Sequence, residues 1–509
     1  MRTLRDAIDA HAAARPDAPC VLAPEPDAVL TYRDLARSAD ALGAYLAQQG
    51  ILPGSVVSFM LPNGVAAASV FLGAMYAGYV VSPVNLIAQD TQLAYTLAHS
   101  GTRIVFAAPE FIDRLHALRP RDRGEIVLRA TDPDRLDLPG MPATGLAALT
   151  EETPAMLMYT SGTTGEPKGV LLMHRNMIHA ARAVAAAQKL SETDRVFSSL
   201  PLYHINGQCV ATVAPIVSGG SIVMPHRFSA SQWWGLVERY RPTWLNVVPT
   251  IIAYLLNGPD LTADQAQACR GVRFGRCASA PLPPEQHRAF EDRFGISVIE
   301  AMGLTETASI AFANPVDPSR RKYGSAGLPL GVEARVVASD GSVLGDGERG
   351  EIQLRGESVM AGYYQDPERT AQVLSSEGWL STGDLGYRDA DGFYFITGRL
   401  KELIIKGGEN IAPREIDEAL MRHPAVLEAA AVGIPDPVYG QDILACVVLK
   451  PGIPCDEAEL RAHCLEQLGR YKTPRAFRLV AALPKGPSGK VQRLRLLALG
   501  GEEANGTNT

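Results

Sequence analysis

The pattern of apolar and polar positions predicts alternating helices and buried strands over the first three hundred residues. Thr31, with Asp34 three residues later, is typical of a helix N-cap, and apolar residues then recur at helical spacing up to Leu46. Short apolar runs separated by helical segments follow at 56–61, 79–82, 103–107, 221–225, 244–249 and 298–303. Because buried parallel strands are short, apolar and joined by helices, this pattern predicts an α/β fold with doubly wound parallel sheets.

The pattern changes after residue 325. Apolar runs at 332–337 and at Val343 flank the turn Asp340-Gly341, which predicts a β-hairpin. Two further strands are expected at 352–355 and 393–396. Together they predict a small antiparallel, barrel-like element attached to the parallel sheets.

Mixed α/β patterns continue after Gly398. Helices are expected at 413–422 and 457–468, and strands at 429–432 and 444–449. Roughly 110 residues are enough for a separate small domain. We therefore expect a large composite N-terminal domain over 1–398 and a smaller, mobile α+β C-terminal domain over 399–509, ending in a disordered polar tail over 500–509.

Composition narrows the class of protein. The 509 residues include 48 Lys plus Arg and 55 Asp plus Glu, a net charge of −7 that argues against nucleic-acid binding. None of the seven cysteines forms a CxxC pair, which argues against a zinc ribbon and favours reduced thiols in the cytoplasm. The most apolar stretch, 65–84, is rich in Ala, Gly and Ser, so it predicts a buried helix and strand in place of a membrane span.

The segment 159–170, YTSGTTGEPKGV, combines hydroxyl groups, glycines and a lysine. Such a loop can wrap backbone N–H groups and hydroxyls around phosphate oxygens. It is not a Walker A loop, because Pro167 stands where that motif has the glycine before the lysine. A plain turn of Gly, Thr and Pro is the alternative interpretation. The candidate phosphate-binding residues are Thr160, Ser161, Gly162, Thr163, Thr164, Gly165 and Lys168.

This segment resembles the signature loop of the acyl-adenylate-forming superfamily, which includes acyl-CoA synthetases, adenylation domains that load carrier proteins and firefly-type luciferases. Further motifs resemble those of the family and occur in its order along nearly the whole chain: LPLYHINGQ (200–208), ASAPLP (278–283), AMGLTET (301–307), STGDLGY (381–387), GRLKELIIKGGENIAPREI (398–416) and PKGPSGKVQR (484–493).

The resemblance implies the nucleotide contacts. Glu306 would be the Mg²⁺ ligand, since a hard cation that bridges phosphates prefers a carboxylate, and Thr305 would bond the α-phosphate. Asp384 would accept hydrogen bonds from the ribose hydroxyls, and Arg399 would lie near the ribose and phosphates. A helix start and a turn are the alternative interpretations of the Thr-Glu pair and of Asp384. The strip that supports adenine would be formed by Ser279, Ala280 and Pro281.

The resemblance also implies a moving catalytic lysine. Lys490 would reach from the small domain to the substrate carboxylate and the α-phosphate, where a compact cation stabilises the transition state. A solvated surface lysine is the alternative. Lys401 would lie at the interdomain hinge, and Gly407 and Gly408 would let the thin pantetheine arm of coenzyme A pass close to the backbone.

The implied reaction is a two-step ligation with ATP, Mg²⁺ and coenzyme A. A carboxylate attacks the α-phosphate to give acyl-AMP and pyrophosphate, and a thiol then attacks the acyl carbonyl to give a thioester and AMP. No GxSxG elbow or Cys/His pair suggests a protein nucleophile. A separate carrier protein as acceptor, a luciferase-like oxidase and a non-catalytic nucleotide-binding protein remain open alternatives.

The acid is the least determined element. The resemblance places the acyl pocket near His204, Asn206, Arg276, Met302 and Gly303, with a catalytic role for His204 as well. His, Asn and Arg form a more polar lining than a fatty-chain tunnel requires, and the cationic arginine would favour a second anionic group. The segments WLNVVPT and GRCASAPL are similar to those of ligases of small dicarboxylates such as oxalate or malonate. If Arg276 instead pairs with a neighbouring acid or the nucleotide, a medium-chain or aromatic acid is expected.

Overall fold

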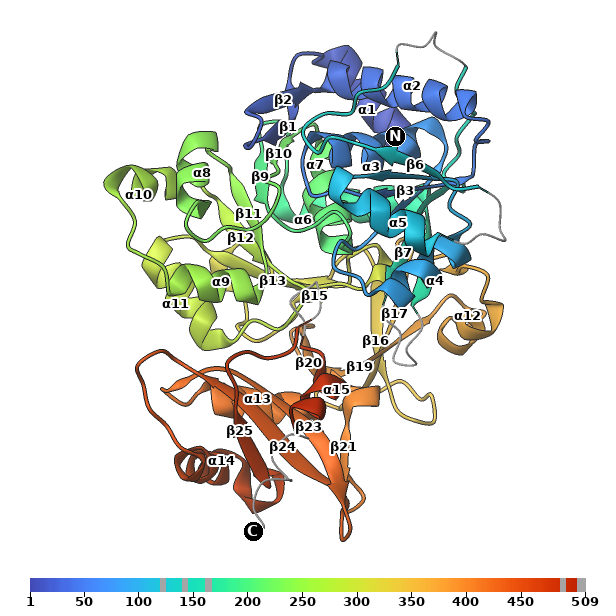
Figure 1. The fold of residues 1–509 in the computed structure, drawn as a ribbon. Helices are drawn as coiled ribbons and strands as arrows, with labels where there is room; N and C mark the ends of the chain where they lie inside the picture. Colours follow the sequence, from blue (N-terminus) through green and yellow to red (C-terminus); the bar gives the residue numbers. More distant parts are fainter. Residues whose placement is uncertain (120–124, 140–144, 161–166, 486–490, 501–509) are drawn as a thin grey trace, which may run out of the picture.

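The computed structural model describes residues 1–119, 125–139, 145–160, 167–485 and 491–500 (Figure 1). Within these ranges the strands form four sheets. Most of the tail expected to be disordered, 501–509, lies outside the described residues.

The two largest sheets are mainly parallel. One has the order β15-β14-β13-β12-β11-β9-β10-β1-β2, in which the central strands from β13 to β1 are parallel. Its strands are β1 (Pro19–Ala23), β2 (Ala28–Thr31), β9 (Arg195–Ser198), β10 (Ser221–Val223), β11 (Trp244–Val247), β12 (Phe274–Cys277), β13 (Val298–Met302), β14 (Phe312–Ala313) and β15 (Leu328–Pro329). We call it the first sheet.

The second sheet has the order β18-β8-β7-β4-β3-β5-β6. Strands β7 and β8 form an antiparallel hairpin at its edge, while β4, β3, β5 and β6 run parallel. Its strands are β3 (Val56–Met60), β4 (Val80–Pro83), β5 (Ile104–Ala107), β6 (Val127–Ala130), β7 (Pro154–Thr160), β8 (Lys168–Met173) and β18 (Gly362–Tyr363).

Helices cover both faces of each large sheet, as the doubly wound prediction requires. One hydrophobic cluster joins residues of both sheets to the helices between them, α1 (Leu4–Ala14), α2 (Tyr32–Gln48), α3 (Val65–Ala77), η2 (Asn206–Val213), α6 (His174–Gln188) and α7 (Ala214–Ser218). A second cluster packs the outer face of the first sheet against α8 (Trp233–Tyr240), α9 (Pro249–Leu256), α10 (Ala263–Cys269) and α11 (Pro284–Phe294). A third packs the second sheet against α4 (Asp90–Ser100) and α5 (Ile112–Leu118).

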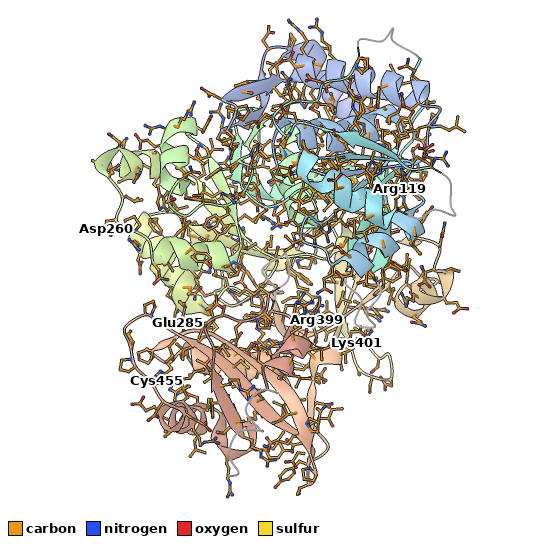
Figure 2. All side chains as sticks on the ribbon, in the orientation of Figure 1. Arg119, Asp260, Glu285, Arg399, Lys401 and Cys455 are labelled. Atoms are coloured by element: carbon orange, nitrogen blue, oxygen red, sulfur yellow. The ribbon has the colours of Figure 1, made fainter. Side chains whose placement is uncertain are left out.

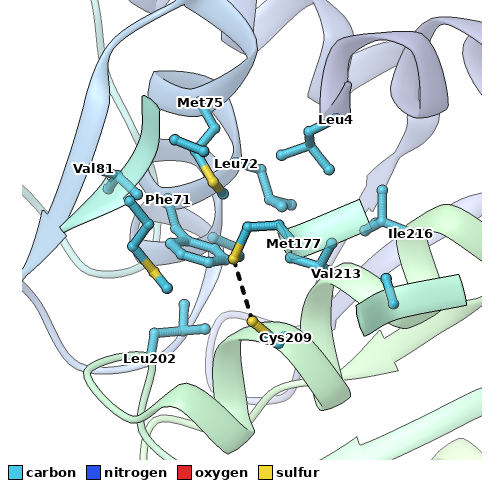
Figure 3. Packing of buried hydrophobic residues seen from close by; sticks show 14 of the residues in the cluster. Leu4, Phe71, Leu72, Met75, Val81, Met177, Leu202, Cys209, Val213 and Ile216 are labelled. Atoms are coloured by element: carbon cyan, nitrogen blue, oxygen red, sulfur yellow. Dashed lines mark hydrogen bonds between the residues drawn. The ribbon is translucent and has the colours of Figure 1, made fainter. Parts of the chain in front are cut away.

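The central cluster fixes the position of η2, which carries Asn206. Figure 3 shows Cys209 of η2 packed against Met177 of α6, with 3.4 Å between the two sulfur atoms. Both side chains are buried. The eight residues of η2 have the wide π-helical winding, which is frequent at functional sites in proteins. The apolar packing of Cys209 against Met177 therefore fixes the position of Asn206, the first residue of η2.

The expected small antiparallel element is present as a four-stranded sheet of β16 (Glu333–Val337), β17 (Gly350–Arg355), β19 (Leu380–Arg388) and β20 (Tyr394–Arg399), with α12 (Pro367–Val373) between β18 and β19. A last sheet contains β21 (Ile404–Lys406), β22 (Glu409–Ile411), β23 (Val426–Asp436), β24 (Gly440–Leu449) and β25 (Ala476–Leu479), with α13 (Pro413–Met421), α14 (Glu457–Lys472) and α15 (Arg493–Leu496). Figure 2 shows Arg399 and Lys401 where the chain passes from one sheet to the other.

Several local predictions are confirmed. Thr31 caps α2 in a capping box with Asp34, and α13 begins at Pro413. The apolar stretch 65–84 forms the buried helix α3 and then β4. Among the described residues, no helix has the length and apolar character needed to cross a membrane. The domain boundary at 398/399 and the mobility of the small domain stay predictions.

Candidate functional site

The candidate residues collect at the carboxyl ends of strands in the two large sheets. Thr160 ends β7, Met302 ends β13, and His204 follows β9 by a short turn. Ser279 follows β12, and Glu306 follows β13 in the short helix η3 (Thr305–Thr307). In open α/β sheets, ligands bind beyond the carboxyl ends of the strands, so the fold brings these residues to the expected edge.

Lys168 and Glu306 are joined through Tyr363, a residue that none of the sequence motifs indicated. The Tyr363 hydroxyl donates to Glu306 Oε1 at 2.9 Å and accepts from Lys168 Nζ at 3.1 Å. Lys168 Nζ also lies 4.5 Å from the centroid of the Tyr363 ring. Burial lowers the pKa of Lys168, against the attraction of Glu306, and Lys401 lowers it further. The charge of Lys168 is therefore influenced by both Glu306 and Lys401.

Asp384 and Arg399 are cross-strand partners on β19 and β20. Arg399 Nε donates to Asp384 Oδ1 at 2.7 Å, and Asp384 raises the pKa of Arg399, opposed by burial. The Asp384 side chain is buried, and its second oxygen, Oδ2, has no hydrogen-bond partner among the described residues. A buried carboxylate oxygen without a donor is costly, so this atom is available to ligand hydroxyls.

The small-residue strip at 279–281 leaves β12 through a left-handed residue, Ser279, with φ of 76°. Its hydroxyl accepts a hydrogen bond of 3.4 Å from Asn206 Nδ2. Ala280 is partly exposed and Pro281 is exposed. Gly303 has a structural requirement of its own, since a Cβ there would lie 2.0 Å from the Ser309 carbonyl oxygen.

Arg276 lies on the face of the first sheet that points toward the central helices. On β11 and β12 this face begins with Trp244 and Phe274, which belong to the central apolar cluster. Two residues further along each strand, it carries Asn246 and Arg276, which are cross-strand partners. Because side chains alternate along a strand, the face changes from apolar to polar as it nears the carboxyl edge.

The Arg276 side chain is fully buried. Its Nη1 donates to Asn206 Oδ1 at 3.1 Å, whereas Nε and Nη2 have no hydrogen-bond partner among the described residues. Burial lowers the pKa of Arg276 to about 10, which leaves the group cationic at neutral pH. The alternative in which Arg276 pairs with a neighbouring acid finds no support, because its one described partner is a neutral amide.

The two glycines at 407 and 408 form the turn between β21 and β22. Their φ angles are 53° and 87°, and Lys406 pairs with Glu409 across the turn. A two-residue hairpin turn with positive φ at both positions favours glycine, whether or not a ligand passes nearby. The expected hinge residue Lys401 lies in the short helix η5 (Leu400–Glu402), directly after β20.

Six residues of the expected site lie outside the described residues. They are Ser161, Gly162, Thr163, Thr164 and Gly165 of the first motif, and the catalytic candidate Lys490. The flanking Thr160 and Lys168 are described and face each other across the β7–β8 hairpin. The predicted phosphate loop therefore connects two paired strands.

The described residues fit ATP with a magnesium ion. No cluster of three or more His, Cys, Asp or Glu side chains able to hold a metal occurs in the described ranges. Mg²⁺ at phosphates is commonly held by one or two carboxylates together with the phosphate oxygens, so Glu306 alone satisfies the requirement on the protein side. The unpartnered oxygen of Asp384 suits the ribose.

A nucleotide-binding α/β enzyme is indicated by Lys168 and Glu306, which meet through Tyr363, and by the ion pair between buried Asp384 and exposed Arg399. Residues 8–364 match the family model described as AMP-binding enzyme, and residues 415–490 match the AMP-binding enzyme C-terminal domain. The chain belongs to this family, and it is an AMP-forming acid–CoA ligase that uses ATP and coenzyme A.

Individual relatives cover nearly the whole chain. A sulfoacetate–CoA ligase from Cupriavidus necator is 57% identical over 503 residues, 97% of each chain. An oxalate–CoA ligase from Arabidopsis thaliana is 32% identical and covers 89% of this chain and 90% of its own. The ATP-bound structure of MatB from Rhodopseudomonas palustris has a TM-score of 0.89 at 29% identity, covering 97% of this chain and 98% of its own.

Proposed function

We propose that this ligase activates a short acid that carries a second anionic group, with sulfoacetate as the foremost substrate. The supporting observation is Arg276, a buried cation with two nitrogen donors that have no partner in the described part of the chain. An uncompensated buried charge costs several kcal/mol, and an anionic ligand removes that cost. The planar guanidinium fork suits two oxygens of a sulfonate or carboxylate. The 57% identity to a sulfoacetate–CoA ligase favours the sulfonate.

The first step is the attack of the acid's carboxylate oxygen on the α-phosphorus of ATP, with pyrophosphate as the leaving group. Lys168 and the loop that follows Thr160 would hold the phosphates, Thr305 would bond the α-phosphate, and Glu306 would bind the magnesium ion that neutralises phosphate charge. Asp384 and Arg399 would hold the ribose, and Ser279, Ala280 and Pro281 would support adenine. Support comes from the Lys168–Tyr363–Glu306 contacts and from the unpartnered Asp384 oxygen.

The acid would be held at its other end. Arg276 would bind the second anionic group, while His204, Asn206, Met302 and Gly303 would line the rest of the acyl pocket. Lys490 would stabilise the developing charge in the adenylation step, since catalysis without a protein nucleophile rests on charge stabilisation and positioning. These roles rest on matching motifs and on the position of the described residues at the strand ends.

In the second step the coenzyme A thiol loses its proton, its sulfur bonds to the acyl carbon, and AMP leaves. We propose that the domain over 399–509 rotates near Lys401 between the steps and that the Gly407-Gly408 turn lines the path of the pantetheine arm. The position of Lys401 between two sheets supports this proposal. A cytoplasmic location is supported by the seven cysteines, all of which are free and buried.

An acid panel tests the substrate. Initial rates of AMP formation with ATP and coenzyme A are compared for sulfoacetate, malonate, oxalate, propionate, octanoate and coumarate. We expect the highest kcat/KM for a dianionic acid, with sulfoacetate first. A preference for octanoate or coumarate would refute the proposal and favour the medium-chain or aromatic alternative. Arg276→Gln is expected to lower kcat/KM selectively for the dianionic acids.

A further inference from the structure

The partner of Arg276 differs from those of two other arginines of low exposure, Arg321 and Arg493. The nearly buried Arg321 side chain lies 3.3 Å from a Glu291 oxygen, and the Arg493 side chain contacts the Asp417 carboxylate. Arg276 is more deeply buried than either, yet its described contact is an amide oxygen, that of Asn206. Where a buried arginine has a purely structural role, a carboxylate partner is expected, because it compensates the charge.

The amide of Asn206 is oriented by its own neighbours. Its oxygen Oδ1 accepts from Arg276 Nη1 at 3.1 Å and from Asn246 Nδ2 at 3.4 Å. Its nitrogen Nδ2 donates to Ser279 Oγ at 3.4 Å. Two donors on one side and one acceptor on the other fix which end of the amide faces the arginine. The packing of η2 against α6 holds the backbone of Asn206 in place.

Asn246 supports the same arrangement from the neighbouring strand. It is fully buried, stands beside Arg276 in the register of β11 and β12, and lies 3.5 Å from Ser198 Oγ. Asparagine and aspartate have nearly the same shape, so an aspartate would fit at 206 or 246. It would bring a negative charge to the guanidinium and neutralise it within the protein.

We propose that Asn206, which contacts Arg276, and Asn246, which contacts Asn206, are specificity-determining positioning residues. Their neutral amides leave the charge of Arg276 uncompensated until a second anionic group of the substrate arrives. The proposal rests on the proposed function and adds a reason for the discrimination against monoanionic acids. An acid without the second anion leaves a buried cation unpaired, which disfavours its binding. Specificity would thus depend on a neutral amide, in place of a carboxylate, as the described partner of Arg276.

The test is the isosteric variant Asn206→Asp, assayed with sulfoacetate and propionate. We expect the ratio of the two kcat/KM values, sulfoacetate over propionate, to fall at least about 100-fold, mainly through a higher KM for sulfoacetate. Asn206→Leu removes the acceptor without adding charge, and its ratio is expected to change far less. Asn257→Asp adds the same charge at an exposed position, and its ratio is expected to equal that of the wild type.

If Asn206→Asp does not fold, Asn246→Asp gives the same test from the neighbouring strand, with the same expected fall in the ratio. A folded aspartate variant that keeps the wild-type ratio overturns this inference and leaves the proposed function intact. An equal fall in Asn206→Leu also overturns it, because the effect would then be due to lost packing or hydrogen bonding. A wild-type enzyme that prefers propionate refutes the proposed function itself.

Discussion

Replacing Arg276 by methionine is expected to stabilise the ligand-free protein, although substrate binding is proposed to depend on this arginine. Burial lowers its pKa from the ordinary arginine value to about 10, which corresponds to about 3 kcal/mol of unfavourable free energy in the folded state. The group is protonated below pH 10 in both folded and unfolded chains, so the full cost is present at neutral pH. Methionine fills similar space without charge.

The gain is partly offset by the loss of the hydrogen bond from the charged Arg276 Nη1 to Asn206, worth about 1.5 kcal/mol. The net expectation is a stabilisation of about 1.5 kcal/mol. With an unfolding entropy of about 2.1 cal/mol/K per residue and a cooperative unit of about 400 residues, the thermal midpoint should rise by about 2 °C.

Thermal unfolding followed by calorimetry or dye binding measures this change. A second arm adds sulfoacetate together with α,β-methylene-ATP, whose α–β bridge cannot be cleaved. The ligands should raise the midpoint of the wild type further than that of Arg276→Met, because ligand that binds only the folded state stabilises it. A variant that is at least 1 kcal/mol less stable than the wild type would contradict this expectation and show that Arg276 is compensated within the protein.

Three further predictions follow from other contacts. Tyr363→Phe removes the hydroxyl between Lys168 and Glu306. In a pyrophosphate-release assay, kcat/KM for ATP should fall about 10- to 100-fold, as expected for a hydrogen bond to a charged group. The adjacent Tyr364→Phe is the control, and equal effects of the two variants would contradict the role of Tyr363. Burial raises the pKa of Glu300 to about 7, so between pH 4.5 and 7 the folded protein holds a proton that the unfolded chain releases, and stability falls as pH rises. Glu300→Gln should therefore be more stable than the wild type by about 2–3 kcal/mol at pH 8 and by much less at pH 5 in urea unfolding, and a pH-independent difference would exclude this cause. Gly407→Ala puts a Cβ on a backbone with φ of 53°, 3.1 Å from Tyr471 Oη, and should slow thioester formation about tenfold while pyrophosphate release is retained. Gly452→Ala, at a φ of 77° with open space around it, is the matched control. A loss of both half-reactions in Gly407→Ala would count against a role of this turn in the second step.

Local elements could be predicted from the sequence because short-range chemistry determines them. The Thr31–Asp34 capping box and the end of the regular part of α14 before Gly469 depend on residues close in the chain. The lengths of the strands could be predicted less well from the sequence. Strand β23 runs over Val426–Asp436 and β24 over Gly440–Leu449, longer than the apolar runs suggested, because the antiparallel pairing continues through polar residues.

The sequence predicted the site residues that lie in motifs, but not the contacts between residues distant in the chain. Tyr363 contacts Lys168 across 195 positions of sequence, and no local pattern around Tyr363 indicates that contact. The burial of Arg276 was likewise hidden, because FGRC alternates apolar and other residues as a half-exposed strand also would. Asn246 lies beside Arg276 only because of the register of β11 against β12, which is a tertiary property.

A competition between acids tests most directly whether the enzyme prefers an acid with a second anionic group. The enzyme is given ATP, a limiting amount of coenzyme A and equal concentrations of sulfoacetate, propionate, octanoate and coumarate, and the thioesters formed are quantified by mass spectrometry. We expect the thioester of sulfoacetate to dominate, because sulfoacetate alone among these acids brings a second strong anion to Arg276. A product mixture dominated by the octanoyl or coumaroyl thioester would contradict it.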